Sequence, residues 1–211
     1  MISNEQKAYV YLTSLFCSAL VIASVLASKI ISIGKFSAPA GIIAYSLTYL
    51  STDIIGEIYG PDAAKSTIRA GFISLVFTTV LVQLSLILPG ATFWENDEAY
   101  RSVFSNSWRI VLASLTAYIV SQSTDHFIFH RLRERTRGRH LWLRNNISTI
   151  SAQIVDSLIF ILIGFGYSPI YFQLVFGQIM LKSLIAILDT PLVYAGKALL
   201  TKRSTLVTQN G

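Results

Sequence analysis

The sequence predicts an all-α integral membrane protein, a single bundle of six transmembrane helices with both ends in the cytoplasm. Of its 211 residues, 53% are apolar and only 13% are charged, whereas soluble domains carry about 25% charged residues. The mean hydropathy is +0.56. Long uncharged runs recur along the chain, and Lys and Arg gather between them. Together these features exclude a soluble enzyme, a disordered chain and a nucleic-acid binder, despite a net charge of +6.

The spans follow from the uncharged runs, because about 20 apolar residues cross about 30 Å of hydrocarbon. The first run looks like a signal peptide, but it has no clear cleavage site and further spans follow it. Pro89-Gly90 ends the third helix, and Gly164-Phe165-Gly166 ends the fifth. Alternating strand patterns are absent, which favours helices throughout. The predicted spans of this one domain, 1–211, are 8–28, 39–59, 70–89, 108–129, 147–166 and 170–199.

Basic residues set the predicted orientation. With the N-terminus inside, twelve of the 17 Lys and Arg residues fall in cytoplasmic segments and four fall outside, while Lys182 lies within a span. The excess charge is therefore a topology signal that places the basic 131–146 loop in the cytoplasm. Cys17 is the single cysteine, so no intramolecular disulfide is expected. The three histidines do not form a metal set, and we expect neither a metal nor a cofactor.

Several polar side chains lie within the predicted spans, where a carboxylate costs about 2.5–3.5 kcal/mol on insertion scales. They are spaced to share helix faces, and Gln-x-x-Asp occurs in both the fourth and fifth spans. Lys182 and Asp189 are about 10.5 Å apart along one helix, so Lys182 is expected to meet a carboxylate of another helix. The candidate substrate-binding residues are Asp53, Glu57, Gln122, Asp125, Asn145, Gln153, Asp156, Lys182 and Asp189.

Amides and carboxylates together suit a flat, polar heterocycle with adjacent N–H groups and a carbonyl, such as a guanine-like base. A carboxylate also suits a cationic amine. Structural hydrogen bonding between helices is the alternative role for each polar residue. Aromatic side chains that could stack on such a ring are Tyr49, Tyr59, Phe127, Phe129 and Phe160.

Five segments resemble the queuosine-precursor branch of the vitamin uptake transporter family. The first, 47–60, contains Asp53-x-x-x-Glu57-x-Tyr59-Gly60. The most specific is His140-Leu-Trp-Leu-Arg-Asn-Asn146, and Phe129-His-Arg-Leu132 precedes it. The remaining two are 151–157 and 189–194. The chain departs from the family at Gly56, where Asn is common, and at Ser24, where Asn often stands.

The resemblance implies a multi-pass protein of the cell inner membrane that is a transporter and not an enzyme. It would import 7-cyano-7-deazaguanine or 7-aminomethyl-7-deazaguanine for queuosine synthesis. Its partners would be this small molecule and the lipid bilayer, with no nucleic acid, and a homodimer is an assembly that the sequence leaves open.

Two other functions stay open at this point. A substrate-binding component of an energy-coupling-factor importer would use the small-residue stripe Ala19-x-x-x-Ala23-x-x-x-Ala27 to contact a coupling subunit, although packing within the bundle explains that stripe as well. An intramembrane aspartyl protease would use Asp125 and Asp156 as a catalytic pair. The Gly-x-Gly-Asp and Tyr-Asp contexts of such proteases are missing from this sequence.

Overall fold

The computed structural model of the protein describes residues 4–136 and 141–185. Its elements are α1 (Asn4–Leu26), β1 (Ile30–Ile33), β2 (Phe36–Pro39), α2 (Ile42–Tyr59), α3 (Pro61–Ile87), α4 (Asp97–Phe104), α5 (Ser107–Arg135) and α6 (Leu141–Phe165). A further apolar helix, Tyr171–Ile185, follows and is called the 171–185 helix below.

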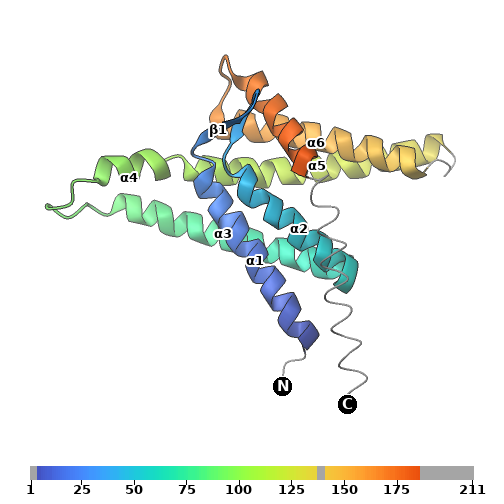
Figure 1. Ribbon diagram of the computed structural model, residues 1–211, viewed down its shortest axis with the longest axis horizontal. Coiled ribbons are helices and arrows are strands. Elements are labelled where there is room, and N and C mark those ends of the chain that lie inside the picture. Colours follow the sequence, from blue (N-terminus) through green and yellow to red (C-terminus); the bar gives the residue numbers. More distant parts are fainter. Residues whose placement is uncertain (1–3, 137–140, 186–211) are drawn as a thin grey trace.

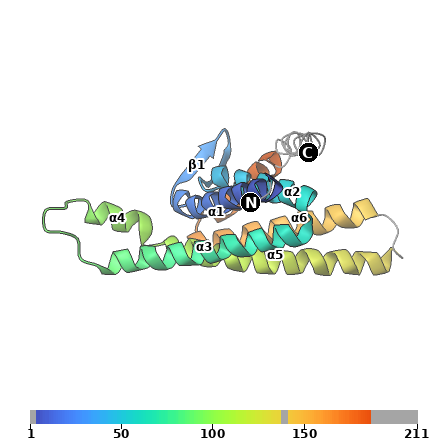
Figure 2. The same cartoon turned by 90° about the horizontal axis from the view of Figure 1, so that it is seen from below.

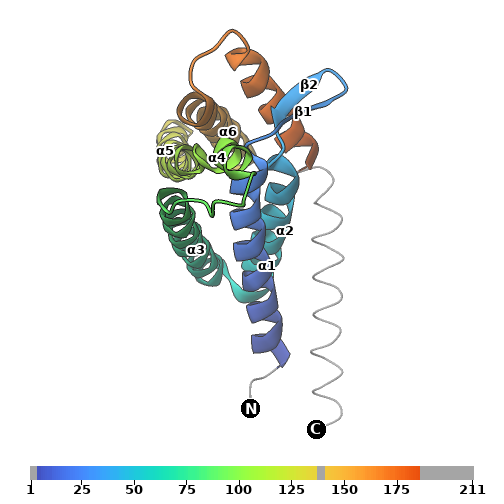
Figure 3. The same ribbon diagram turned by 90° about the vertical axis from the view of Figure 1, so that its left-hand side faces the viewer.

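The long helices form two layers. Helices α3, α5 and α6 run along the long axis of the molecule, and α1 and α2 cross them (Figure 1). From below, α1, α2 and the β1–β2 hairpin lie on one side of the α3, α5 and α6 layer (Figure 2). In Figure 3 the view is close to the axes of α3, α5 and α6, whereas α1 and α2 are seen from the side. Helices α1, α2 and α3 pack on one another, and α5 packs on α6.

The described part of each predicted span contains a helix, and the helix ends differ from the predicted bounds. Within the described residues, four stretches are long and apolar enough to cross a membrane: Glu5–Leu26, Pro61–Ile87, Asp97–Leu132 and Asn146–Phe165. The sixth predicted span begins as a helix at Tyr171, but its residues 186–199 lie outside the described part. Helix α3 exposes a stripe of large apolar side chains at Ile73, Phe77, Val80 and Leu84, which suits a surface against lipid. The protein is a multi-pass membrane protein.

Turn chemistry explains where several helices begin and end. Gly60, with φ of 87°, separates α2 from α3, and Pro61 opens α3, where its missing N–H leaves no helical bond unmade. Gly166, with φ of 78°, follows the end of α6 and matches the stop expected there. Helix α3 starts at Pro61, nine residues before the start of the span predicted at 70–89.

An antiparallel hairpin corrects the expectation of helices alone. Strands β1 and β2 pair from Ile30 opposite Pro39 to Ile33 opposite Phe36. Only Gly34 and Lys35 separate the strands, and Gly34 has φ of 60°, the left-handed conformation that two-residue hairpin turns require. Pro39, the expected start of the second span, therefore ends β2, and α2 begins at Ile42.

The small-residue stripe of α1 is packed inside the bundle. Ala19, Ala23 and Ala27 are 3%, 1% and 3% exposed. A Cβ on Gly41 would stand 2.5 Å from the Ala23 carbonyl oxygen, so the start of α2 lies directly on this stripe. Ala27 also joins a core of α5, α6 and 171–185 helix residues. Since the chain itself covers the stripe, these alanines are not a free surface for a coupling subunit.

Candidate functional site

A central cavity lies where the six long helices meet. Its volume is about 150 Å³, roughly ten times the space that one water molecule needs. Side chains from α1, α2, α3, α5, α6 and the 171–185 helix line it, together with Pro39 and Gly41 beside the hairpin. Its polar side chains are Ser24, Tyr45, Thr48, Tyr49, Thr52, Ser114, Tyr118, Asp156, Gln178 and Lys182.

Three serine and threonine hydroxyl groups of the cavity wall offer acceptors. Ser24 donates to the Val21 carbonyl at 2.7 Å and Ser114 donates to the Ile110 carbonyl at 2.9 Å. Thr48 donates in the same way to the Tyr45 carbonyl at 2.7 Å. Each hydroxyl has one proton, and these protons are already engaged by the helix backbone. A ligand at these positions therefore meets oxygen lone pairs and has to supply donors.

One ion pair in the cavity wall joins two helices. The Lys182 ammonium group, on the 171–185 helix, donates a hydrogen bond to the Asp156 carboxylate on α6. The two side chains are 9% and 25% exposed, so both charges are largely removed from water. This contact confirms the prediction that Lys182 meets a carboxylate of another helix, and it ties α6 to the 171–185 helix at the cavity.

Gln178 is a cavity residue that the sequence analysis missed. Its side chain is 6% exposed, and its amide oxygen is buried without a hydrogen-bond partner in the described structure. Such an oxygen costs about 1–3 kcal/mol when it stays unsatisfied. Gln178 stands one turn before Lys182, on the same helix face, and this i, i+4 spacing was the available sequence signal.

Aromatic rings form much of the remaining wall, with Phe16, Tyr45, Tyr49, Phe72, Tyr118 and Phe160 in the lining. Phe72 and Tyr118 meet edge to face, with ring centroids 4.9 Å apart. Of the aromatic residues expected near a ligand, Tyr49 and Phe160 line the cavity. Phe127 is 68% exposed on α5, and neither Phe129 nor Tyr59 belongs to the lining.

The structure brings Asp156 and Lys182 into this cavity, and it places the other described candidates outside the lining. Asp53 and Glu57 are exposed on α2, as is Gln122 on α5. Gln153 is half-buried on α6. The side chain of Asn145 and all of Asp189 lie outside the described residues.

Antiparallel packing explains why the two Gln-x-x-Asp faces do not converge here. A Cβ on Gly164 of α6 would stand 3.2 Å from Ile110 of α5. Counting eight residues along each helix from this contact brings Asp156 level with Tyr118, and both line the cavity. Asp125 stands seven residues further along α5, about 10.5 Å away. Its Oδ1 atom is buried without a partner in the described structure, away from the cavity lining.

A family comparison decides the class of protein. Residues 39–196 match the model of a family described as "Putative vitamin uptake transporter". The chain belongs to this vitamin uptake transporter family. Membership agrees with the resemblance seen in the sequence and identifies a transporter, not an enzyme. The matched range contains Asp156, Gln178 and Lys182.

Three curated relatives of this family member carry related names. The chain is 28% identical over 186 residues to the "Probable queuosine precursor transporter" of Bacillus subtilis, covering 86% of this chain and 81% of the relative. It is 28% identical to the "Queuosine precursor transporter" of Escherichia coli, covering 79% and 73%. A relative of the same kind in Haemophilus influenzae is 25% identical, covering 64% and 54%. No solved structure matches.

Proposed function

We propose that this protein imports queuosine precursors, the deazapurines 7-cyano-7-deazaguanine and 7-aminomethyl-7-deazaguanine, across the cell inner membrane. The names of the three relatives support this substrate class. The observation that carries the proposal is the cavity itself, which six helices enclose and which offers acceptors and aromatic faces.

The chemistry of a deazaguanine complements that wall. Its ring presents N–H groups to the hydroxyl oxygens of Ser24, Thr48 and Ser114, which have no proton left to donate. Its carbonyl accepts from an amide or from the Lys182 ammonium group, and its flat faces lie between the aromatic side chains. A substrate of this kind satisfies polar atoms that an apolar solute would leave unpaired.

The membrane arrangement is part of the proposal. Six spans with both ends in the cytoplasm put the basic 131–146 loop inside, in agreement with the distribution of Lys and Arg. Helix α2 and the 171–185 helix complete the six, because both contribute to the cavity between the longer helices. In this proposal the protein transports its small-molecule substrate without an ATPase partner, and a homodimer is compatible with this role.

Uptake by purified protein in liposomes tests the function. We expect both deazaguanines to bind and to enter the vesicles without any ATPase partner, and unlabelled guanine analogues to compete. Vesicles without protein are the control. Accumulation above equilibrium that needs a proton gradient assigns proton coupling, whereas equilibration alone assigns facilitated diffusion. If neither precursor binds or enters, the proposed function is wrong.

A further inference from the structure

The charge content of the cavity bears on which precursor it prefers. Among the described residues of the lining, Asp156 and Lys182 are the charged ones, and they neutralise each other through their ion pair. A ligand that enters therefore meets a largely apolar wall in which the charges of the described residues cancel. It also meets an ammonium group that is already in place.

The two candidate precursors differ in the charge of the substituent at one ring position. The nitrile of the cyano form is neutral, whereas the alkylamine of the aminomethyl form is a cation at neutral pH. A second cation in the cavity would face Lys182 and would have to share the one described carboxylate of the lining. Like-charge repulsion is several times stronger in a partly dry cavity than in water. The nitrile can instead accept a hydrogen bond from the ammonium group.

We infer that Lys182 is a specificity-determining residue that makes the cavity select the neutral, nitrile-bearing precursor over the cationic, amine-bearing one. The inference rests on the proposed function and deepens it, since it concerns the choice between two substrates of the same site. Lys182 acts as the resident cation, and Asp156 holds it at the cavity wall.

A cycle of four proteins separates charge from shape. Calorimetric titration of the purified proteins with both precursors gives the ratio of the two dissociation constants. The wild type is expected to bind the cyano form at least about tenfold more tightly. Lys182→Met leaves the cavity with one negative charge and shifts the ratio toward the amine. Asp156→Asn leaves one positive charge and shifts it further toward the nitrile. The double variant is neutral but has no resident ammonium group, so its preference for the nitrile is expected to fall below that of the wild type.

Lys65→Met is the matched control, because Lys65 forms an exposed ion pair with Asp62 at 3.5 Å on α3, outside the cavity. This variant is expected to keep the wild-type ratio. Equal affinities in the wild type, or a ratio that is the same in all four proteins of the cycle, overturn the inference and leave the proposed function standing. The ratio of the two dissociation constants for the wild type tests the inference even if a variant fails to fold. Absence of binding by both precursors overturns the proposed function together with the inference.

Discussion

The backbone carbonyl of Ser37 lies directly against Gly177, so that the β2 strand touches the 171–185 helix where this helix has no side chain. Nearby contacts secure the same junction. Gln173 donates to the Ser37 hydroxyl at 3.4 Å, and the Phe36 and Phe176 rings are 5.9 Å apart. The hairpin is therefore attached to the helix that carries Gln178 and Lys182.

Gly177→Ala should destabilise the protein, because the added methyl group would overlap backbone atoms of Ser37, which cannot rotate away. Overpacking of this kind costs about 1–3 kcal/mol, which lowers the melting temperature by several degrees in a detergent-solubilised sample. Gly56→Ala is the control. Its new Cβ would meet only the Ala64 methyl group at 3.9 Å, so it should gain about 0.5–1 kcal/mol of helix stability. Equal melting temperatures for the two variants would contradict the packing described here.

Gln178→Met should weaken precursor binding by about tenfold or more while leaving thermal stability unchanged or slightly higher. The variant keeps the length of the side chain, and the amide oxygen that it removes has no partner to lose. Binding and melting curves on the same sample separate the two effects. Gln83→Met is the matched control, because Gln83 donates to Ser107 at 3.2 Å outside the cavity. It should lose a little stability and no binding.

Asp156→Ala should lower the free energy of unfolding by about 3 kcal/mol, because it leaves the Lys182 charge largely buried without its carboxylate. The double variant Asp156→Asn/Lys182→Met removes both charges and should recover most of this loss. Thermal denaturation of the three proteins in one detergent measures the difference. A double variant less stable than Asp156→Ala would show that the pair contributes more than mutual neutralisation.

Reporter fusions test the orientation. A cytoplasmic reporter placed within 131–146 or after Lys202 should be active, because the proposed orientation places twelve of the 17 basic residues on that side. A fusion within 95–98, at the start of α4, should give the opposite result. A periplasmic signal from either of the first two positions would require a different number of spans.

The helices could be predicted because uncharged runs of membrane length leave few alternatives for the backbone. The hairpin was missed although Gly34-Lys35 separates Ile30–Ile33 from Phe36–Pro39 as a two-residue turn does. The strands are only four residues each, and they adjoin a predicted span. Apolar character therefore dominated the interpretation of this segment.

The candidate site could be predicted only in part. Lys182 and Asp156 were found because a charge within a span demands a partner. The convergence of Asp125 with Asp156 was not correct for this cavity. A repeat carried by two antiparallel helices runs in opposite directions, so equal spacing in sequence becomes an offset in space. Gln178 carries no charge and lies in an apolar segment, and only the tertiary contacts reveal its unpaired oxygen.

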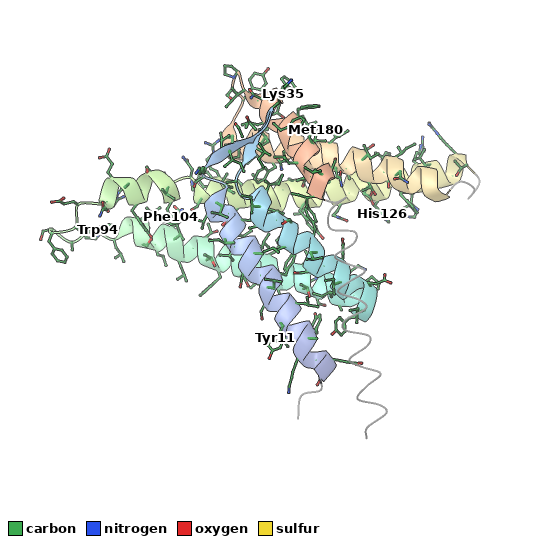
Figure 4. All side chains as sticks on the ribbon, viewed as in Figure 1. Tyr11, Lys35, Trp94, Phe104, His126 and Met180 are labelled. Carbon is green, nitrogen blue, oxygen red and sulfur yellow. The ribbon has the colours of Figure 1, made fainter. Side chains whose placement is uncertain are left out.

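Because the hairpin packs on the 171–185 helix, Lys35 at the hairpin tip is connected to the helix that carries two residues of the cavity lining. Figure 4 shows Lys35 at the far end of the hairpin, with Met180 on the attached helix. A displacement of that helix during transport has to carry the hairpin tip with it. Since Cys17 is the single cysteine, a Cys17→Ser/Lys35→Cys protein accepts one spin label or fluorophore at the tip. Such a label would report any displacement of the helix that carries Gln178 and Lys182, without a probe in the cavity.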